Sequence, residues 1–268
     1  MKKTIVSILF ILCLIFALAI ASADEIVLAD NDNVCIKVKS METSGNSFEM
    51  KLYLENKSSV TAMFTIDGTV VNGFVADPFW ASEIAPGKKS NETVSIHDLS
   101  SKGITEDVSI ISFVIRAYDS NDWFADDLHK ERFTLYPLGE ENASIAERKP
   151  QESDTVIVDN DTVAIIVTGY GTDSIWGYTA NLFLENKTDK DVMFTVDNTS
   201  VNGFMIDPFW ATEIPPHAKA FSGMSWRDSS LAENDIESVE EIETTFRAYD
   251  SNDWFADDYY KDTVTLKP

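Results

Sequence analysis

The chain has 268 residues, of which 44% are hydrophobic and 25% are charged, a composition typical of a globular protein and not of a disordered or collagen-like one. Aspartate and glutamate together number 45 and lysine and arginine 21, so the formal net charge is -24. Because like charges repel, a chain with this excess of acid is a poor partner for nucleic acid or an anionic membrane surface, and no nucleic-acid partner is predicted.

The N-terminus is predicted to be a secretory signal peptide, residues 1–23. Two early lysines precede a mainly apolar run at 5–20, and the small residues 21–23 resemble a cleavage site. The alternative is an uncleaved membrane anchor. No later segment has the roughly 18 apolar residues that span a bilayer. We therefore expect an exported mature chain without a transmembrane segment, located in the cell envelope or outside the cell.

An internal duplication organises the rest of the chain. The twelve residues at 116–127 recur identically at 247–258, and residues 71–86 closely match 201–216. Matching segments are separated by 129 to 131 positions, so few residues are inserted between the copies. The predicted units are a first repeat over 24–137, a linker over 138–154 and a second repeat over 155–268. The linker is polar and charged, which predicts a flexible or semi-extended connection that leaves the orientation of the repeats free.

Within each repeat, apolar and polar residues alternate, which is the pattern of a strand with one buried face. Turn residues such as Asp67-Gly68 and Pro86-Gly87 interrupt the pattern. In chain order, the strands predicted for the first repeat are 25–29, 33–41, 47–55, 60–66, 69–76, 91–97, 107–118 and 131–136. Seven or eight short strands in about 110 residues predict an all-β protein with two tandem immunoglobulin-like antiparallel β-sandwiches after the signal peptide.

Two segments carry a resemblance to a known group of proteins. Residues 71–79 are followed by a turn at 86–89, and residues 201–209 by a turn at 216–219. This arrangement resembles the secreted immunoglobulin-like domains of unknown function found in low-GC Gram-positive and related microbes, and it departs from them at Pro216-His217-Ala218-Lys219. The resemblance implies a sandwich fold and export, and it supplies no catalytic residues.

The duplicated acidic loop is a candidate calcium site. Calcium is held by six to eight oxygen atoms, and short acidic loops provide them. The candidate ligands are Asp119, Asn121, Asp122, Asp126 and Asp127 in the first repeat and Asp250, Asn252, Asp253, Asp257 and Asp258 in the second. The alternatives are a solvated loop in which these side chains form local turns, or a surface that faces a partner. No other cofactor is predicted.

Aromatic residues and two arginines form the candidate binding surface. Tryptophans occur in the acidic loops and in the two DPFWA segments. The favoured interpretation is that they close the ends of the sandwiches. The alternative is that they form an exposed platform for a sugar or a partner chain. Tyr53 and Phe183 occupy the polar faces of their strands and are expected to be exposed. The candidates are Tyr53, Trp80, Arg116, Trp123, Phe183, Trp210, Arg247 and Trp254.

Catalysis has little support in the sequence. Two carboxylate pairs, Asp77 with Glu83 and Asp207 with Glu213, have the residue types of a glycosidase, but such pairs arise by chance when 45 residues are acidic. No histidine recurs at the matching position of the other repeat. The chain is therefore predicted to be a non-catalytic exported protein that binds an unknown protein or glycan at or near the cell surface. A calcium-stabilised structural module of the envelope is the alternative, and a carbohydrate-active hydrolase is a second one.

Overall fold

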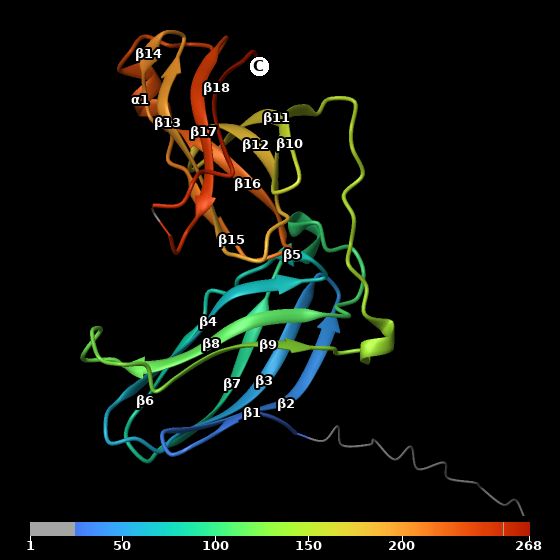
Figure 1. The fold of residues 1–268 in the computed structure, drawn as a ribbon, viewed down its shortest axis with the longest axis vertical. Helices are drawn as coiled ribbons and strands as arrows, with labels where there is room; N and C mark the ends of the chain where they lie inside the picture. The colour runs from blue at the N-terminus through green and yellow to red at the C-terminus, as the bar shows by residue number, and fades with distance from the viewer. Residues whose placement is uncertain (1–24, 254) are drawn as a thin grey trace, which may run out of the picture.

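The computed structural model describes residues 25–253 and 255–268 (Figure 1). The predicted signal peptide and the candidate Trp254 lie outside the described residues. The described residues form mainly antiparallel strands, with a short helix α1 (Asp228–Ala232) and two 3-10 turns, η1 (Leu99–Lys102) and η2 (Glu140–Asn142). The predicted all-β class is confirmed. None of the helices in the described part of the chain is long and apolar enough to cross a membrane.

Each repeat contributes strands in the same order. Those of the first repeat are β1 (Ile26–Asp30), β2 (Val34–Ser44), β3 (Ser47–Asn56), β4 (Ala62–Val71), β5 (Phe74–Val75), β6 (Ala81–Ile84), β7 (Lys89–Ile96), β8 (Ile111–Asp119) and β9 (His129–Leu135). Those of the second are β10 (Thr155–Asp159), β11 (Val163–Asp173), β12 (Gly177–Asn186), β13 (Val192–Val201), β14 (Phe204–Met205), β15 (Ala211–Ile214), β16 (Lys219–Trp226), β17 (Ile242–Asp250) and β18 (Tyr260–Leu266).

The strands form three sheets, of which the central one extends through both repeats (Figure 1). A four-stranded sheet has the order β1-β2-β3-β7. The nine-stranded sheet has the order β10-β11-β12-β16-β5-β4-β8-β9, with β6 paired to β4. The last sheet has the order β14-β13-β17-β18, with β15 paired to β13. The second repeat therefore contributes four strands of the central sheet and the first repeat contributes five.

The predicted alternation of side chains is present in β3. This strand buries its four apolar side chains, Phe48, Met50, Leu52 and Leu54, and the polar residues between them are exposed or half-buried. Successive residues of a strand point to opposite faces, so one face joins the core and the other meets solvent. This local pattern explains why the strand positions were predictable.

Buried side chains gather in two clusters. One contains residues from 28 to 135 together with a single residue of the second repeat, Phe183. The other lies wholly within residues 163–266. Phe64 and its counterpart Phe194 are both fully buried, each in the cluster of its own repeat. Each repeat therefore buries the apolar faces of its own strands, and the two clusters meet at one place.

The turn predicted at Asp67-Gly68 is a bulge inside a continuous strand. Strand β4 runs through this point, and its register with β8 shifts between Asp67 and Val70. A bulge accommodates an extra residue without reversing the chain, and Gly68 accepts the positive φ of 56° that this one requires. The chain reverses instead at Asn72-Gly73, a two-residue turn with positive φ at both positions, which joins β4 to β5.

The two repeats are joined by backbone pairing. Strand β5 pairs in parallel with β16 at Phe74 and Lys219, and the amide nitrogen of Lys219 donates to the carbonyl oxygen of Gly73 at 2.9 Å. The ring of Phe74 stacks on Phe221 with centroids 5.9 Å apart and lies 6.5 Å from the ring of Phe183. An apolar contact and a main-chain hydrogen bond therefore act at the same junction.

The linker over 138–154 contacts both repeats, in contrast to the predicted free connection. Arg148 and Asp154 form two parallel hydrogen bonds of 2.7 and 2.5 Å, and their side chains are only 10% and 7% exposed. The guanidinium carbon of Arg148 lies 5.2 Å from the ring centroid of Phe183. Polar composition suggested solvation, but these charged groups are paired with each other and therefore tolerate burial.

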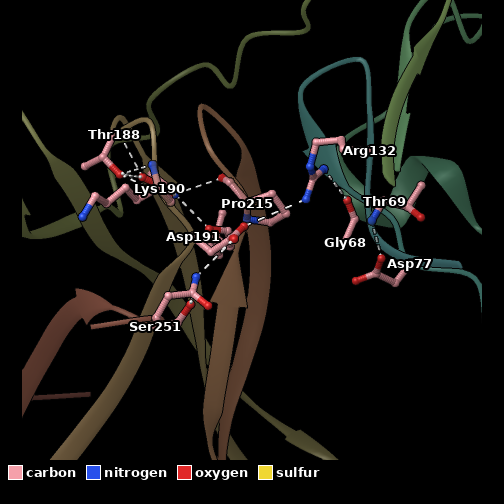
Figure 2. Close-up of polar contacts among 12 residues, drawn as sticks. Gly68, Thr69, Asp77, Arg132, Thr188, Lys190, Asp191, Pro215 and Ser251 are labelled. Carbon is pink, nitrogen blue, oxygen red and sulfur yellow. Dashed lines mark hydrogen bonds and ion pairs between the residues drawn. The ribbon is translucent and has the colours of Figure 1, made fainter. Parts of the chain in front are cut away.

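A further contact at the junction comes from Arg132 of β9. Figure 2 shows its side chain between the two repeats, where Nη1 donates to the carbonyl oxygen of Gly68 at 3.1 Å. Its Nη2 lies 4.0 Å from a carboxylate oxygen of Asp191, which belongs to the second repeat. This ion pair is about one third exposed on both sides, so it contributes little energy but adds a directional contact.

Candidate functional site

An open groove of about 850 Å³ lies on the second repeat, over β11, β12 and β16. Ala180 and Leu182 of β12 point into the core, so Thr179 and Asn181 point to the opposite face, where the groove lies. The lining residues are Gly171, Thr172, Asp173, Trp176, Thr179, Asn181, Pro208, Phe209, Trp210, Ala211, Thr212, Ser222, Gly223 and Ser225.

The loop between β11 and β12 holds one wall of the groove. A carboxylate oxygen of Asp173 accepts hydrogen bonds from the amides of Ile175 and Trp176 at 2.7 and 2.9 Å, and these bonds lower the pKa of Asp173. The loop ends at Gly177, whose φ is 84° and where a Cβ atom would lie 2.3 Å from the carbonyl oxygen of Trp226. Only glycine fits there, and this local geometry positions the indole of Trp176.

Phe209 lines the groove beside Trp176. Its amide nitrogen donates to the carbonyl oxygen of Ser225 at 2.8 Å, which attaches this segment to the edge of β16. The rings of Phe209 and Trp176 are stacked, with centroids 5.7 Å apart and planes 3° from parallel. Their side chains remain 69% and 45% exposed. The ring surfaces that do not meet in this stack are therefore available to a ligand.

Trp210, a predicted binding residue, lies at the groove with its orientation fixed. The indole nitrogen donates to the hydroxyl of Ser222 at 2.9 Å. The ring also meets Phe246 edge-to-face, with centroids 6.1 Å apart, and packs against the second core. These two contacts hold the ring at the groove margin.

The floor of the groove consists of small polar residues. The hydroxyls of Thr179 and Ser225 are 2.8 Å apart and hydrogen-bonded to each other. The side-chain amide of Asn181 has no hydrogen-bond partner among the residues that the structure describes. A Cβ atom at Gly223 would lie 3.1 Å from the methyl group of Thr179, so glycine keeps this part of the floor low. The floor thus offers both space and an unused donor and acceptor.

The same face of the first repeat carries larger, charged side chains. In the second repeat Thr179 pairs with Ser225 and Asn181 with Gly223 across β12 and β16. The matching pairs across β3 and β7 in the first repeat are Glu49 with Ser95 and Lys51 with Thr93. The preceding loop is also one residue shorter in the first repeat, with Asn46 where the second has Trp176.

The carboxylates of the first acidic loop are engaged locally. Asp119 and Asp122 each accept a hydrogen bond from the backbone amide two residues later, at 2.9 and 3.0 Å. Asp127 forms an ion pair of 2.7 Å with Arg116, whose guanidinium lies 4.4 Å from the ring centroid of Tyr118. The predicted binding residue Arg116 is thus paired within its own loop.

The second acidic loop repeats these contacts and adds one. Asp253 accepts from the backbone amide two residues later at 3.1 Å, and Asp258 pairs with Arg247 at 2.9 Å. Asp250 pairs with Lys190 at 2.6 Å, and this hydrogen bond lowers the pKa of Asp250. Arg247 lies 4.3 Å from the ring of Tyr249.

The described parts of the acidic loops do not form a metal-binding cluster. Over residues 25–253 and 255–268, no three side chains of histidine, cysteine, aspartate or glutamate converge on one point. Asn121, Asp126, Asn252 and Asp257 belong to loops in which neighbouring carboxylates already serve backbone amides or arginines. The geometry supports local turns and ion pairs more than calcium.

The remaining aromatic candidates have different surroundings. Tyr53 is half-buried, with the ammonium groups of Lys37 and Lys89 at 5.7 and 5.9 Å from its ring, and its hydroxyl donates to Glu55 at 2.9 Å. Trp80 packs against the first core, as expected for a residue that closes a sandwich. Neither residue lines the groove described above.

Two expectations about exposure are wrong. Phe183, expected on a solvent-facing side, is 5% exposed because Phe74, Phe221 and Arg148 cover it at the junction between the repeats. Trp123, for which burial at the end of the sandwich was favoured, is 69% exposed. Local alternation gave the face on which Phe183 lies, but not the neighbour that covers that face.

The two predicted carboxylate pairs lie outside the groove. Asp77 accepts a hydrogen bond from the backbone amide of Thr69, a contact shown in Figure 2. Glu83 and Glu213 belong to the short strands β6 and β15, and Asp207 precedes the groove-lining segment. None of the four lines the groove.

Trp176 was not predicted from the sequence as a binding residue, and Phe209 was noted only as part of a repeated motif. A signal for Trp176 was available, because it lies in a loop that is one residue longer than its counterpart in the first repeat and no aromatic residue occupies the matching position there. Phe209 and its counterpart Phe79 are in the matching motifs, so the duplication alone did not distinguish them. The stacking with Trp176 does.

No family model and no curated protein matches this chain. Solved structures similar to this chain include the YadV chaperone, at 14% identity over 87% of this chain and 100% of that chain, with a TM-score of 0.27. They also include the Salmonella enterica SafA pilin in complex with the SafB chaperone, at 11% identity over 89% of this chain and 98% of that chain, with a TM-score of 0.24. A third is the CsuC-CsuE chaperone-tip adhesion subunit pre-assembly complex of Acinetobacter baumannii, at 11% identity over 84% of this chain and 93% of that chain, with a TM-score of 0.23. Similarity at this level assigns no partner or activity to the chain.

Proposed function

We propose that the protein is an exported, non-catalytic binding protein made of two tandem immunoglobulin-like sandwiches, over residues 24–137 and 155–268. Its ligand is a macromolecule of the cell surface and occupies the groove of the second repeat. The observation that carries the proposal is the groove itself, in which a fixed aromatic pair faces unpartnered polar groups.

The lining of the groove favours binding over catalysis. Asp173 is the only lining residue with a titratable acid or base, and its carboxylate already accepts two backbone hydrogen bonds. General acid–base chemistry needs a proton donor and acceptor within reach of the substrate. Among the lining residues there is no histidine, lysine, cysteine or second carboxylate to take the other role.

The junction between the repeats supports a structural role for the first repeat, which is to hold the groove of the second repeat in a fixed position. Main-chain pairing at Lys219, the ring of Phe74 and the buried Arg148–Asp154 pair all restrict movement at one place. A sandwich attached in this way holds the groove at a defined distance and direction from the strands of the first repeat. The acidic charge keeps such an exported chain soluble.

The test is retention of the chain lacking residues 1–23 on isolated cell-envelope material. Trp176→Ala is the groove variant, and Trp123→Ala is the matched control, since it removes an exposed indole from the first repeat. Unfolding midpoints of all three proteins are measured in parallel. The expected result is retention of the wild type and Trp123→Ala, loss of retention for Trp176→Ala, and unchanged midpoints.

Two results contradict the proposal. Equal retention of the wild type and Trp176→Ala removes the groove as the binding site. Selective loss of retention for Trp123→Ala transfers the function to the acidic loop of the first repeat.

A further inference from the structure

We infer that the groove of the second repeat binds a neutral carbohydrate chain, an inference that rests on the proposed function and names the class of its ligand. The relevant juxtaposition is the parallel pair Trp176–Phe209 beside a floor of hydroxyl and amide side chains. The C–H faces of sugar rings pack on flat aromatic surfaces, while their hydroxyl groups need donors and acceptors at the side.

The aromatic groups meet the first requirement. The planes of Trp176 and Phe209 are only 3° apart, and both rings keep a large exposed area. Two hydrogen bonds anchor them: the Trp176 amide donates to the side-chain carboxylate of Asp173, and the Phe209 amide donates to the carbonyl oxygen of Ser225. Ordering these rings therefore costs little when a ligand arrives, because the loops that carry them are already fixed.

The polar lining meets the second requirement, which is donors and acceptors for the hydroxyl groups of a sugar. Asn181, Thr172 and Thr212 line the groove, and their side chains have no hydrogen-bond partner among the described residues. An amide and a hydroxyl can each donate and accept, as a sugar hydroxyl does. Purely apolar ligands would leave these groups desolvated and unpaired, which disfavours their binding.

Charge selects a neutral ligand. The lining contains no lysine, arginine or histidine, and its one carboxylate is Asp173. The chain as a whole carries a formal charge of -24. An anionic polymer would therefore meet repulsion and no counter-charge at this site.

The edge of β16 disfavours a peptide that extends the sheet. Such a peptide binds through free main-chain groups of an edge strand. One end of the β16 edge pairs with β5 at Lys219, and the other bonds to Phe209 at Ser225. The groove lies between these occupied ends, and its volume of about 850 Å³ is within the roughly 300–1,000 Å³ of small-ligand sites. A few sugar rings of an open-ended chain suit this space.

The experiment measures binding of the chain lacking residues 1–23 to an array of neutral and anionic glycans, followed by titration of each bound neutral oligosaccharide by calorimetry. The variants are Trp176→Ala, Asn181→Ala and the control Trp123→Ala. We expect at least one neutral glycan to bind, a rise in Kd of about tenfold or more for Trp176→Ala, a smaller rise for Asn181→Ala, and no change for Trp123→Ala.

Absence of binding to every neutral glycan overturns the inference, as does binding that Trp176→Ala leaves unchanged. Envelope material treated with protease separates this failure from that of the proposed function. If retention depends on Trp176 but disappears after protease treatment, the groove binds protein and only the carbohydrate inference fails. If retention never depends on Trp176, both fail.

Discussion

The two repeats have twelve consecutive identical residues and the same strand order, yet they differ on one face. In the second repeat, the face over β12 and β16 is a groove with small polar residues beneath Trp176 and Phe209. The first repeat has Glu49 and Lys51 on the matching face. The two copies therefore share the alternation that buries their apolar side chains, and they differ on one exposed face.

The repeats also differ in how they use one motif. Phe74 and its counterpart Phe204 stand in the same VNGF sequence and each begins a two-residue strand. Phe74 is 1% exposed because it meets Phe221 and Phe183 of the following repeat. Phe204 is 47% exposed. Identical sequence thus gives opposite burial, according to what lies next to it.

The largest expected effect is on stability, when Phe74 and its counterpart Phe204 are each replaced by alanine. Phe74→Ala should lower the free energy of unfolding by about 3–5 kcal/mol, because it leaves a cavity at the junction. Phe204→Ala should change it by no more than about 0.5 kcal/mol, as surface substitutions usually do. Denaturant titration of both variants checks this. Equal losses would contradict the difference in burial.

A smaller effect is expected when the groove is made to resemble the first repeat. Asn181→Lys introduces the residue found at position 51 and should weaken ligand binding about tenfold, near 1.4 kcal/mol, by filling the floor. Stability should stay within about 0.5 kcal/mol, since Asn181 is exposed. Calorimetric titration and thermal unfolding measure the two quantities, and Lys51→Asn serves as the control that leaves binding unchanged. If Asn181→Lys leaves the affinity for the ligand unchanged, Asn181 is not part of the binding site.

A still smaller, pH-dependent effect should distinguish the two acidic loops. Lys190 bonds to Asp250, whereas the matching position in the first repeat is Val60. The bond lowers the pKa of Asp250 below its ordinary 3.8, so the stabilisation is complete above that value and is lost as the pH falls through the lower, folded-state pKa. Lys190→Met should therefore be less stable than the wild type at pH 7, and the two should converge well below pH 4. A constant difference across this range, measured by denaturant unfolding, would show that the ion pair is not its cause.

The smallest effect is expected for calcium. Most of the described carboxylates of the two acidic loops accept hydrogen bonds from backbone amides or pair with basic side chains, and no metal-binding cluster is found among the described residues. Unfolding midpoints with calcium and with a chelator should therefore agree. Differential scanning calorimetry makes this comparison. A midpoint that rises with calcium concentration would restore the calcium-stabilised alternative, because a ligand that binds only the folded state stabilises it.

Much of the fold was predictable because the information is local. The alternation in β3 and its repetition in β12 placed strands within a few residues, and the turn residues marked most of their ends. Asp67-Gly68 was misread because a bulge and a turn both favour glycine with positive φ, and the sequence does not distinguish them. The short strand β6 was missed because four residues give too little alternation to detect.

The candidate site was predictable only in part. Trp210 was identified, but its role depends on Ser222, which lies on another strand. Trp176 and Phe209 are 33 positions apart, and nothing in either segment indicates that the rings stack. Side-chain contacts of this kind depend on how two loops meet at the edge of a sheet.

By itself, the sequence determined the duplication, the strand periodicity and the acidity, because each follows from residue types at short spacing. Tertiary structure alone decided which exposed face became a groove, and how β5, β16 and the linker join the repeats. Burial of Phe183 shows the reason: a side chain's local pattern gives the direction in which it points, and only a distant segment of the chain, here Phe74, decides whether water or protein lies there.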